Sequence, residues 1–209
     1  MDPITSNMFM GASGKKLEIG LSYQGGYFAG YMSHTADGIA THALIVAPAA
    51  SGYTTLQWKT TNTSSPDTSS DYDGATNTAS MADINHPAAN FCANLSIGGY
   101  TDWYMPARDE LEIAYYNLKP TSYLNSTNFG INNHAVPQRL SNYTSGNPAQ
   151  TNLILFQEGN SEAFVASNNW SSNNSGTSAA IAVNFIVGAK NAVNKDVALY
   201  VRAFRKIAL

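Results

Sequence analysis

Asparagine, serine and threonine make up 60 of the 209 residues, and this excess constrains the fold more than any other feature of the sequence. Their short polar side chains hydrogen-bond to nearby backbone groups and favour turns and loops over helix interiors. Charged residues make up only 12% of the chain, against about 25% in a typical soluble domain. We therefore expect a loop-rich chain with limited helix. The hydrophobic fraction of 44% is still high enough for a packed core.

Charge and hydropathy argue against nucleic-acid binding, membrane insertion and secretion by a signal peptide. Lysine and arginine number 11 against 14 acidic residues, and no basic cluster occurs, which argues against nucleic-acid binding. No apolar run approaches the ~20 residues that would insert into a membrane. The first residues, Met1 to Ile4, lack the basic and apolar regions of a secretory signal. If the protein works outside a cell, we expect another route, such as assembly into a virus particle.

The apolar pattern predicts two helices. Residues 107–118 place Leu111, Ala114, Tyr115 and Leu118 on one helical face. A first helix is expected over residues 79–95, with Thr78 as its N-cap and with a break or restart at Pro87.

Short apolar or aromatic runs predict strands on both sides of these helices. They lie at residues 27–32, 43–47, 56–59, 163–166, 181–187 and 197–204. We read residues 20–209 as one α+β domain with two helices, short antiparallel sheets and long loops. Residues 1–19 are expected to be a leader or an oligomerisation segment.

The sequence contains no recognisable catalytic motif. The four histidines do not have metal-ligand spacing, and no nucleophile or phosphate-binding motif is present. Cys92 lies in an apolar stretch and is expected to be a buried filler. Asp109, Glu110 and Glu112 are expected to form a solvated helix face rather than an acid–base pair. The sequence therefore predicts a protein that is not an enzyme and has no cofactor.

A long polar loop is expected over residues 60–78. Its carboxylates at Asp67, Asp71 and Asp73 are compatible with a calcium site, since calcium takes several oxygen ligands. The closing glutamate of the common calcium loop is missing. A solvated loop is therefore the favoured interpretation, and calcium remains the alternative.

Two separate motifs in this chain resemble one known family. The first is Gly98-Gly99-Tyr100-Thr101-Asp102-Trp103-Tyr104-Met105-Pro106, followed by Ala107-Arg108-Asp109-Glu110-Leu111. The second comprises Trp170-Ser171-Ser172, Asn184-Phe185, Gly188 and Tyr200-Val201-Arg202-Ala203-Phe204-Arg205. Both are similar to the C-terminal domain of collagen-like bacterial adhesins and to phage tail-fibre tips. The resemblance covers about residues 75–205.

The resemblance implies a C-type-lectin-like fold, as in a phage tropism determinant and in variable proteins of diversity-generating retroelements. It also implies a homotrimer on the virion, at the tail-fibre tip, that binds a host cell-surface receptor, either protein or glycan. In such proteins the closing motif is a fixed frame around hypervariable positions.

Residues 173–199, apart from Lys190 and Lys195, contain only residue types that adenine mutation of asparagine codons can produce. The resemblance thus implies a ligand-binding surface formed by these positions: Asn173, Asn174, Thr177, Ser178, Ile181, Val183, Ile186, Val187, Ala189, Asn191, Ala192, Val193, Asn194, Asp196, Val197, Ala198 and Leu199. The alternative is an ordinary loop and strand, with Ile186, Val187, Val197 and Leu199 in the core.

Other functions stay open at this point. A lectin-like adhesin without calcium dependence is the second candidate, because the calcium-binding motifs of sugar-binding lectins are missing. A bacterial surface display protein is a variant of the tail-fibre hypothesis, and the missing secretory signal weighs against it. An enzyme related to formylglycine-generating proteins is disfavoured, because that chemistry resembles a paired-cysteine site and only Cys92 is present.

The frame residues themselves are expected to be structural. Trp103 and Trp170 are expected in the core, because aromatic rings bury large areas. Arg202 and Arg205 are expected to pair with Asp102, Asp109 or Glu110.

Overall fold

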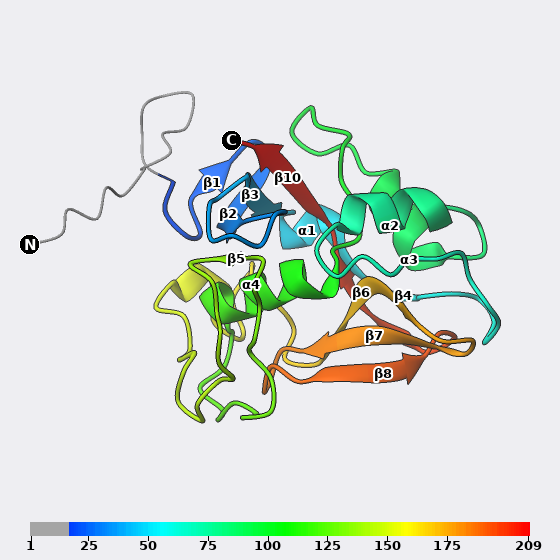
Figure 1. The fold of residues 1–209 in the computed structure, drawn as a ribbon. Helices are drawn as coiled ribbons and strands as arrows, with labels where there is room; N and C mark the ends of the chain where they lie inside the picture. Colours follow the sequence, from blue (N-terminus) through cyan, green and yellow to red (C-terminus); the bar gives the residue numbers. More distant parts are fainter. Residues whose placement is uncertain (1–16) are drawn as a thin grey trace, which may run out of the picture.

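The computed structural model describes residues 17–209, which form a mixed α+β fold, as the sequence predicts (Figure 1). Most of the expected leader, residues 1–16, lies outside the described residues. The described end of that segment contributes to the core, since Leu17 is buried and Ile19 packs against the buried clusters.

The first sheet brings the two ends of the described chain together. Its strand order is β1 (Ser22–Tyr23), β2 (Gly26–Met32), β3 (His42–Val46) and β10 (Phe204–Ala208), and β5 (Ala135–Val136) pairs with β2. The paired strands are antiparallel. The expected strands at 27–32 and 43–47 are therefore confirmed.

The second sheet carries most of segment 173–199. Its order is β4 (Tyr53–Gln57), β9 (Ala198–Arg202), β6 (Asn168–Ser175), β7 (Ala179–Asn184) and β8 (Lys190–Asn194). The pairs are antiparallel except β6 with β9, which run parallel. Figure 1 shows β8 at the free edge of this sheet, below β7.

The predicted strand at 163–166 is wrong. Residues 163–165 form no strand, although Phe164 is fully buried between the rings of Phe185 and Phe204. The apolar run reflects the burial of this ring rather than strand pairing. The expected strand at 197–204 is divided, because Ala203 separates β9 in one sheet from β10 in the other.

The helical region has more elements than the two expected. Four short helices occur in residues 17–209: α1 (Ala49–Gly52), α2 (Gly74–Met81), α3 (Pro87–Ala93) and α4 (Arg108–Leu118). The predicted helix 79–95 is divided because Pro87 restarts the chain at the first position of α3. The N-cap of α2 is Asp73 rather than Thr78, whose side chain is buried within the helix.

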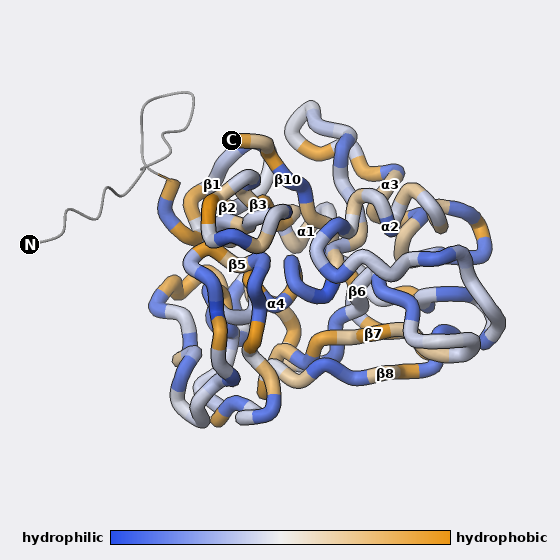
Figure 2. The backbone as a smooth tube through the Cα atoms, in the orientation of Figure 1, coloured by the Kyte–Doolittle hydropathy of each residue, from blue (hydrophilic) through white to orange (hydrophobic). Residues whose placement is uncertain are grey.

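The core consists of two clusters of buried side chains. One contains Trp58, Trp103 and Trp170 with Cys92, and the other contains Leu111, Tyr115 and Phe164 from α4 and its surroundings. The expected burial of both frame tryptophans and of Cys92 is confirmed. Figure 2 shows that β7 is largely hydrophobic and that β8 is largely hydrophilic. Among residues 17–209, no helix has the length and apolar character needed to cross a membrane.

Candidate ligand-binding surface

Segment 173–199 lies in the second sheet, and its strand β8 forms a free edge of that sheet. It includes the end of β6, the β7–β8 hairpin and the first residues of β9. All of the predicted ligand-binding residues except Asn173 and Val183 keep solvent exposure. The most exposed ones are Thr177, Ser178, Ala192, Asn194, Asp196, Val197 and Ala198. These seven lie in the two turns that flank the hairpin, on β8 and at the start of β9.

Asn173 and Val183 are corrections to the predicted surface. Asn173 is 3% exposed because its side chain bonds to three partners inside the fold. Val183 is 1% exposed and packs in the cluster around α4. The alternative of core packing holds in part for Leu199, which packs partly buried against the other cluster, as Val193 also does. It is wrong for Val197, which is 40% exposed.

The residues beneath this surface are held by reciprocal hydrogen bonds. The indole N–H of Trp58 donates to the Ser171 carbonyl at 2.9 Å, and that of Trp170 donates to the Leu56 carbonyl at 3.0 Å. Ser172 accepts a hydrogen bond from the Asn77 amide at 2.9 Å. These side chains link β6 to β4 and α2, so the surface rests on a fixed base.

Two frame residues shape the β7–β8 turn. The Asn184 side-chain oxygen accepts hydrogen bonds from the backbone N–H groups of Ile186 and Val187. Gly188 has a φ of 74° and a Cβ there would lie 2.5 Å from the Tyr115 ring, so only glycine fits. The backbone that carries Ile186, Val187 and Ala189 is therefore set by residues that do not belong to the predicted variable positions.

Lys195 fixes the other end of the hairpin. It is fully buried, and its Nζ donates to the carbonyls of Thr63, Gly176 and Thr177 and lies 5.1 Å from the Trp58 ring centroid. Burial lowers the pKa of this ammonium group. Because the Gly176 and Thr177 carbonyls belong to the turn between β6 and β7, Lys195 orders the loop that carries Thr177 and Ser178.

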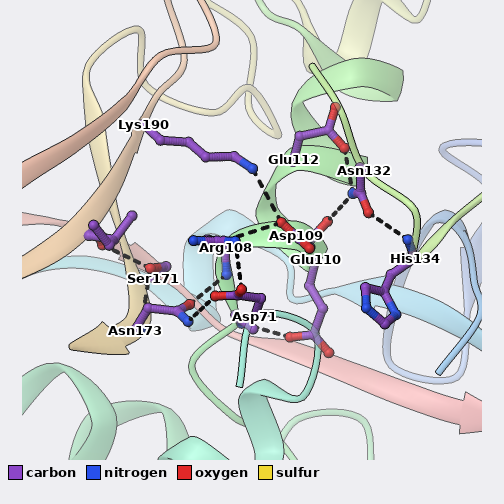
Figure 3. A network of polar contacts seen from close by, with 12 residues as sticks. Asp71, Arg108, Asp109, Glu110, Glu112, Asn132, His134, Ser171, Asn173 and Lys190 are labelled. Atoms are coloured by element: carbon purple, nitrogen blue, oxygen red, sulfur yellow. Dashed lines mark hydrogen bonds and ion pairs between the residues drawn. The ribbon is translucent and has the colours of Figure 1, made fainter. Parts of the chain in front are cut away.

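An open cavity of about 390 Å³ adjoins this surface at Lys190. Its walls come from five separate parts of the chain: Ala36, loop 69–72, the N-terminal turn of α4, loop 131–134 and Lys190. Figure 3 shows how Asp71, Arg108, Asp109 and Lys190 follow one another across this region.

The charged side chains of the cavity form a continuous row of ion pairs. Arg108 lies 2.5 Å from Asp71 and 3.5 Å from the Asp109 carboxylate, which in turn lies 3.2 Å from Lys190 Nζ. Burial raises the pKa of Asp71, while the neighbouring Arg108 opposes that rise. The predicted solvated face is therefore wrong for Asp109, which is 7% exposed.

Aromatic rings form another wall of the cavity. Tyr72 and His134 stack with ring centroids 4.0 Å apart, and His34 meets the Tyr72 ring edge-on. His134 Nδ1 lies 2.8 Å from the Ser33 carbonyl, which fixes the orientation of its ring. Burial lowers the pKa of His34 to about 4, so this ring is neutral at physiological pH.

Glu110 and Glu112 are buried as well, contrary to the predicted solvated face. Glu112 accepts hydrogen bonds from Asn132, Arg139 and Tyr143. Glu110 accepts from the Tyr104 hydroxyl at 2.7 Å and from the backbone N–H of Ala107 and Gly74 at 2.7 and 3.2 Å. Because the Gly74 and Ala107 N–H groups lie at the starts of α2 and α4, Glu110 joins two helix N-termini, and its role is structural.

Glu110 also gives the domain a specific pH dependence. Burial raises its pKa from 4.5 to about 7, so the folded state binds this proton more tightly than the unfolded state. Its contribution to stability is full below about pH 4.5 and is lost as the pH rises through about 7, with a loss of roughly 3 kcal/mol. In Glu110→Gln this loss should disappear. Urea unfolding of both proteins between about pH 5 and pH 8 measures this loss. If the free energy of unfolding falls equally with pH in the wild type and in Glu110→Gln, the prediction is contradicted.

The two frame arginines have different partners. Arg205 pairs with Asp102, as expected, and also donates to the Gln24 carbonyl. Arg202 does not pair with Asp102, Asp109 or Glu110; its partner is Glu162, at 2.6 Å. Glu162 lies in the loop before β6, so helix or strand periodicity in the sequence does not predict its pairing with Arg202.

Two of the three carboxylates considered for calcium have other partners, and the third, Asp67, is exposed. Asp71 pairs with Arg108, whereas Asp73 pairs with Lys206 and caps α2. These partners hold the pKa of Asp73 at about 2, although burial alone would raise it. Within the described part of the chain, no group of three or more His, Cys, Asp or Glu side chains could hold a metal ion.

Most cavity residues were missed by the sequence reasoning. Arg108 and Asp109 lie within the first family motif, but Tyr72, Asn132, Asn133 and His134 lie in loops with no periodic pattern. Only the tertiary fold brings these loops beside Lys190.

The fold and this surface define a mixed α+β domain with an exposed edge hairpin and an adjoining polar cavity. The chain belongs to the Lcl C-terminal domain family, whose model matches residues 51–205. This family is linked to variable phage and bacterial adhesin-like proteins. No curated protein matches the chain.

Proposed function

We propose that this chain is the receptor-binding tip of a phage tail fibre and that segment 173–199 selects the host ligand. The observation that carries the proposal is the contrast between this segment and its base. The side chains of Thr177, Ser178, Ala192, Asn194 and Asp196 are exposed, whereas Trp170, Ser171 and Lys195 beneath them are buried and hydrogen-bonded. Exposed side chains on such a base can change without loss of the fold.

The proposal includes the remaining expectations for this family. We expect a C-type-lectin-like fold, a homotrimer located on the virion, and a host receptor that is a protein or a glycan. Several copies of the surface would raise avidity without strong single contacts. The domain binds its ligand and catalyses no reaction, and nucleic acid is not its partner, because the chain has a net charge of −3.

Adsorption to cells tests the proposal. Fluorescently labelled protein is incubated with a panel of bacterial strains, and we expect strong binding to some strains that unlabelled protein competes away. Equal weak binding to every strain would overturn host recognition. The DNA around the gene tests variability: a near-copy of the region coding for 170–205 should differ mainly at adenines and lie beside a reverse transcriptase gene.

A lectin-like adhesin without calcium dependence is the second candidate, and the polar cavity beside Lys190 favours it. A glycan array measured in calcium and in chelator tests this candidate, which predicts equal glycan binding in both buffers. A bacterial surface display protein would share the same binding surface, and its location on cells rather than virions would identify it.

A further inference from the structure

The cavity beside Lys190 is electrically balanced. Two cations, Arg108 and Lys190, alternate with two carboxylates, Asp71 and Asp109, at 2.5, 3.5 and 3.2 Å. A ligand with a net charge would meet a like charge at one of these groups and would have to displace an existing partner. An uncharged ligand meets no such cost, provided that it can both donate and accept hydrogen bonds.

Hydroxyl groups satisfy this requirement, since each can donate to a carboxylate and accept from an ammonium or guanidinium group. The side chains of Asp71 and Arg108 are 36% and 37% exposed, so their free edges are open to a ligand. Ser69, Ser70 and Asn133 add further polar groups to the same cavity. A molecule with several adjacent hydroxyls could therefore bind at several points at once.

The polar groups of the cavity are held in place before any ligand binds. Asn173 donates to the Asp71 carboxylate at 3.1 Å and accepts from the Arg108 backbone N–H at 2.8 Å (Figure 3). The Asn132 side chain donates to the Asp109 carbonyl at 2.9 Å. Such preorganisation lowers the entropic cost of binding. Asn173 is buried behind the cavity and supports the site, whereas Asn132 is buried within the cavity wall.

The apolar part of the cavity suits a ligand that has a ring with nonpolar faces. Tyr72 and His134 form its aromatic wall, and Ile131 lies at the rim with 51% of its surface exposed. The volume of about 390 Å³ lies at the lower end of the usual range for small-molecule sites. A saccharide unit combines hydroxyls at its edge with nonpolar C–H faces and suits this size.

We propose that this cavity binds an uncharged saccharide unit of the receptor, without calcium, and so anchors the ligand beside segment 173–199. The inference rests on the proposed binding function and names the ligand class of that surface. Calcium is not needed because the donors and acceptors are the protein's own side chains, and the described residues hold no cluster of metal ligands.

Titration with sugars tests the proposal directly. The 209-residue protein, labelled with ¹⁵N, is titrated with glucose, galactose, mannose and N-acetylglucosamine, in calcium and in chelator. At least one sugar should shift the signals of residues 69–72 and 131–134, equally in both buffers. If no sugar shifts them at millimolar concentrations, or if the shifts need calcium, the proposal is overturned.

Two lysines provide a matched pair of variants. Lys190 and Lys206 each have 18% of the side chain exposed and each pair with one aspartate, but only Lys190 lines the cavity. Lys190→Met should weaken sugar binding about tenfold, since it removes one charged hydrogen-bond donor. Lys206→Met should leave the affinity unchanged. Equal affinities in the two variants would contradict the assignment.

Further measurements separate this inference from the proposed function. Asp71→Asn is a second cavity variant, should Lys190→Met fail to fold, and it should also weaken sugar binding. Adsorption of the wild-type protein to cells without any sugar binding would overturn the saccharide site alone. Sugar binding in the cavity without selective adsorption would instead overturn host recognition and leave the site standing.

Discussion

Replacing Arg202 by methionine is expected to destabilise the domain by about 3–5 kcal/mol, because it leaves a buried carboxylate without its cation. The Arg202 guanidinium donates to the Ala47 carbonyl at 2.8 Å, to the Glu162 carbonyl at 2.8 Å and to the Glu162 carboxylate at 2.6 Å. It also lies 4.8 Å from the Phe164 ring centroid. The side chain thus ties the junction of β9 and β10 to the loop before β6.

Urea unfolding measures this loss, and a double variant provides the control. Arg202→Met combined with Glu162→Gln removes the uncompensated charge, so it should recover part of the lost stability. Thermal unfolding should show a midpoint lower by roughly 10 °C in Arg202→Met. A loss below about 1 kcal/mol in the single variant would show that the buried pair does not hold the frame together.

Trp103→Ala should cost about 3–5 kcal/mol, because it removes a large buried ring and leaves a cavity. Trp103 is 2% exposed, its indole N–H donates to the Tyr100 carbonyl at 3.1 Å, and its ring lies 5.5 Å from the Arg205 guanidinium. In Asn191→Ala, by contrast, only one hydrogen bond to Asn168 is lost at the half-buried edge of the sheet. We expect a change within about 0.5 kcal/mol there.

The pair of variants tests the division between frame and binding surface. Differential scanning calorimetry of both proteins should give a much lower midpoint for Trp103→Ala and a nearly unchanged one for Asn191→Ala. Equal melting temperatures would contradict the division.

The fold class could be predicted because its signals are local. The apolar stripe of residues 107–118 predicts α4, and the short apolar runs at 27–32 and 43–47 predict β2 and β3. The strand β6 was missed because Asn168–Ser175 is polar throughout apart from Trp170, yet most of it is buried between β7 and β9. In this strand tertiary pairing overrides the low strand propensity of asparagine and serine.

Residue types single out segment 173–199, most of which keeps solvent exposure, but they do not predict the cavity beside it. The motif around Arg108 and Asp109 predicts a helix start, and an acidic helix start usually faces solvent. Its carboxylates are buried here because Asn132, Lys190 and the turn at Gly74 come from distant parts of the chain to bond with them. Such partners follow from the fold and leave no trace in local sequence spacing.

The most direct test of the central claim exchanges the exposed side chains of segment 173–199 together. Thr177, Ser178, Ala192, Asn194, Asp196 and Ala198 are all exposed, so replacing all six should leave the melting temperature nearly unchanged. A control variant changes exposed residues elsewhere, at Ser80, Ala82 and Glu158.

Adsorption of these variants to a strain that binds the wild-type protein is the decisive measurement. Our account predicts that the exchanged protein is folded and no longer adsorbs, while the control adsorbs like the wild type. A folded exchanged protein that still adsorbs to the same strain with the same affinity would contradict it.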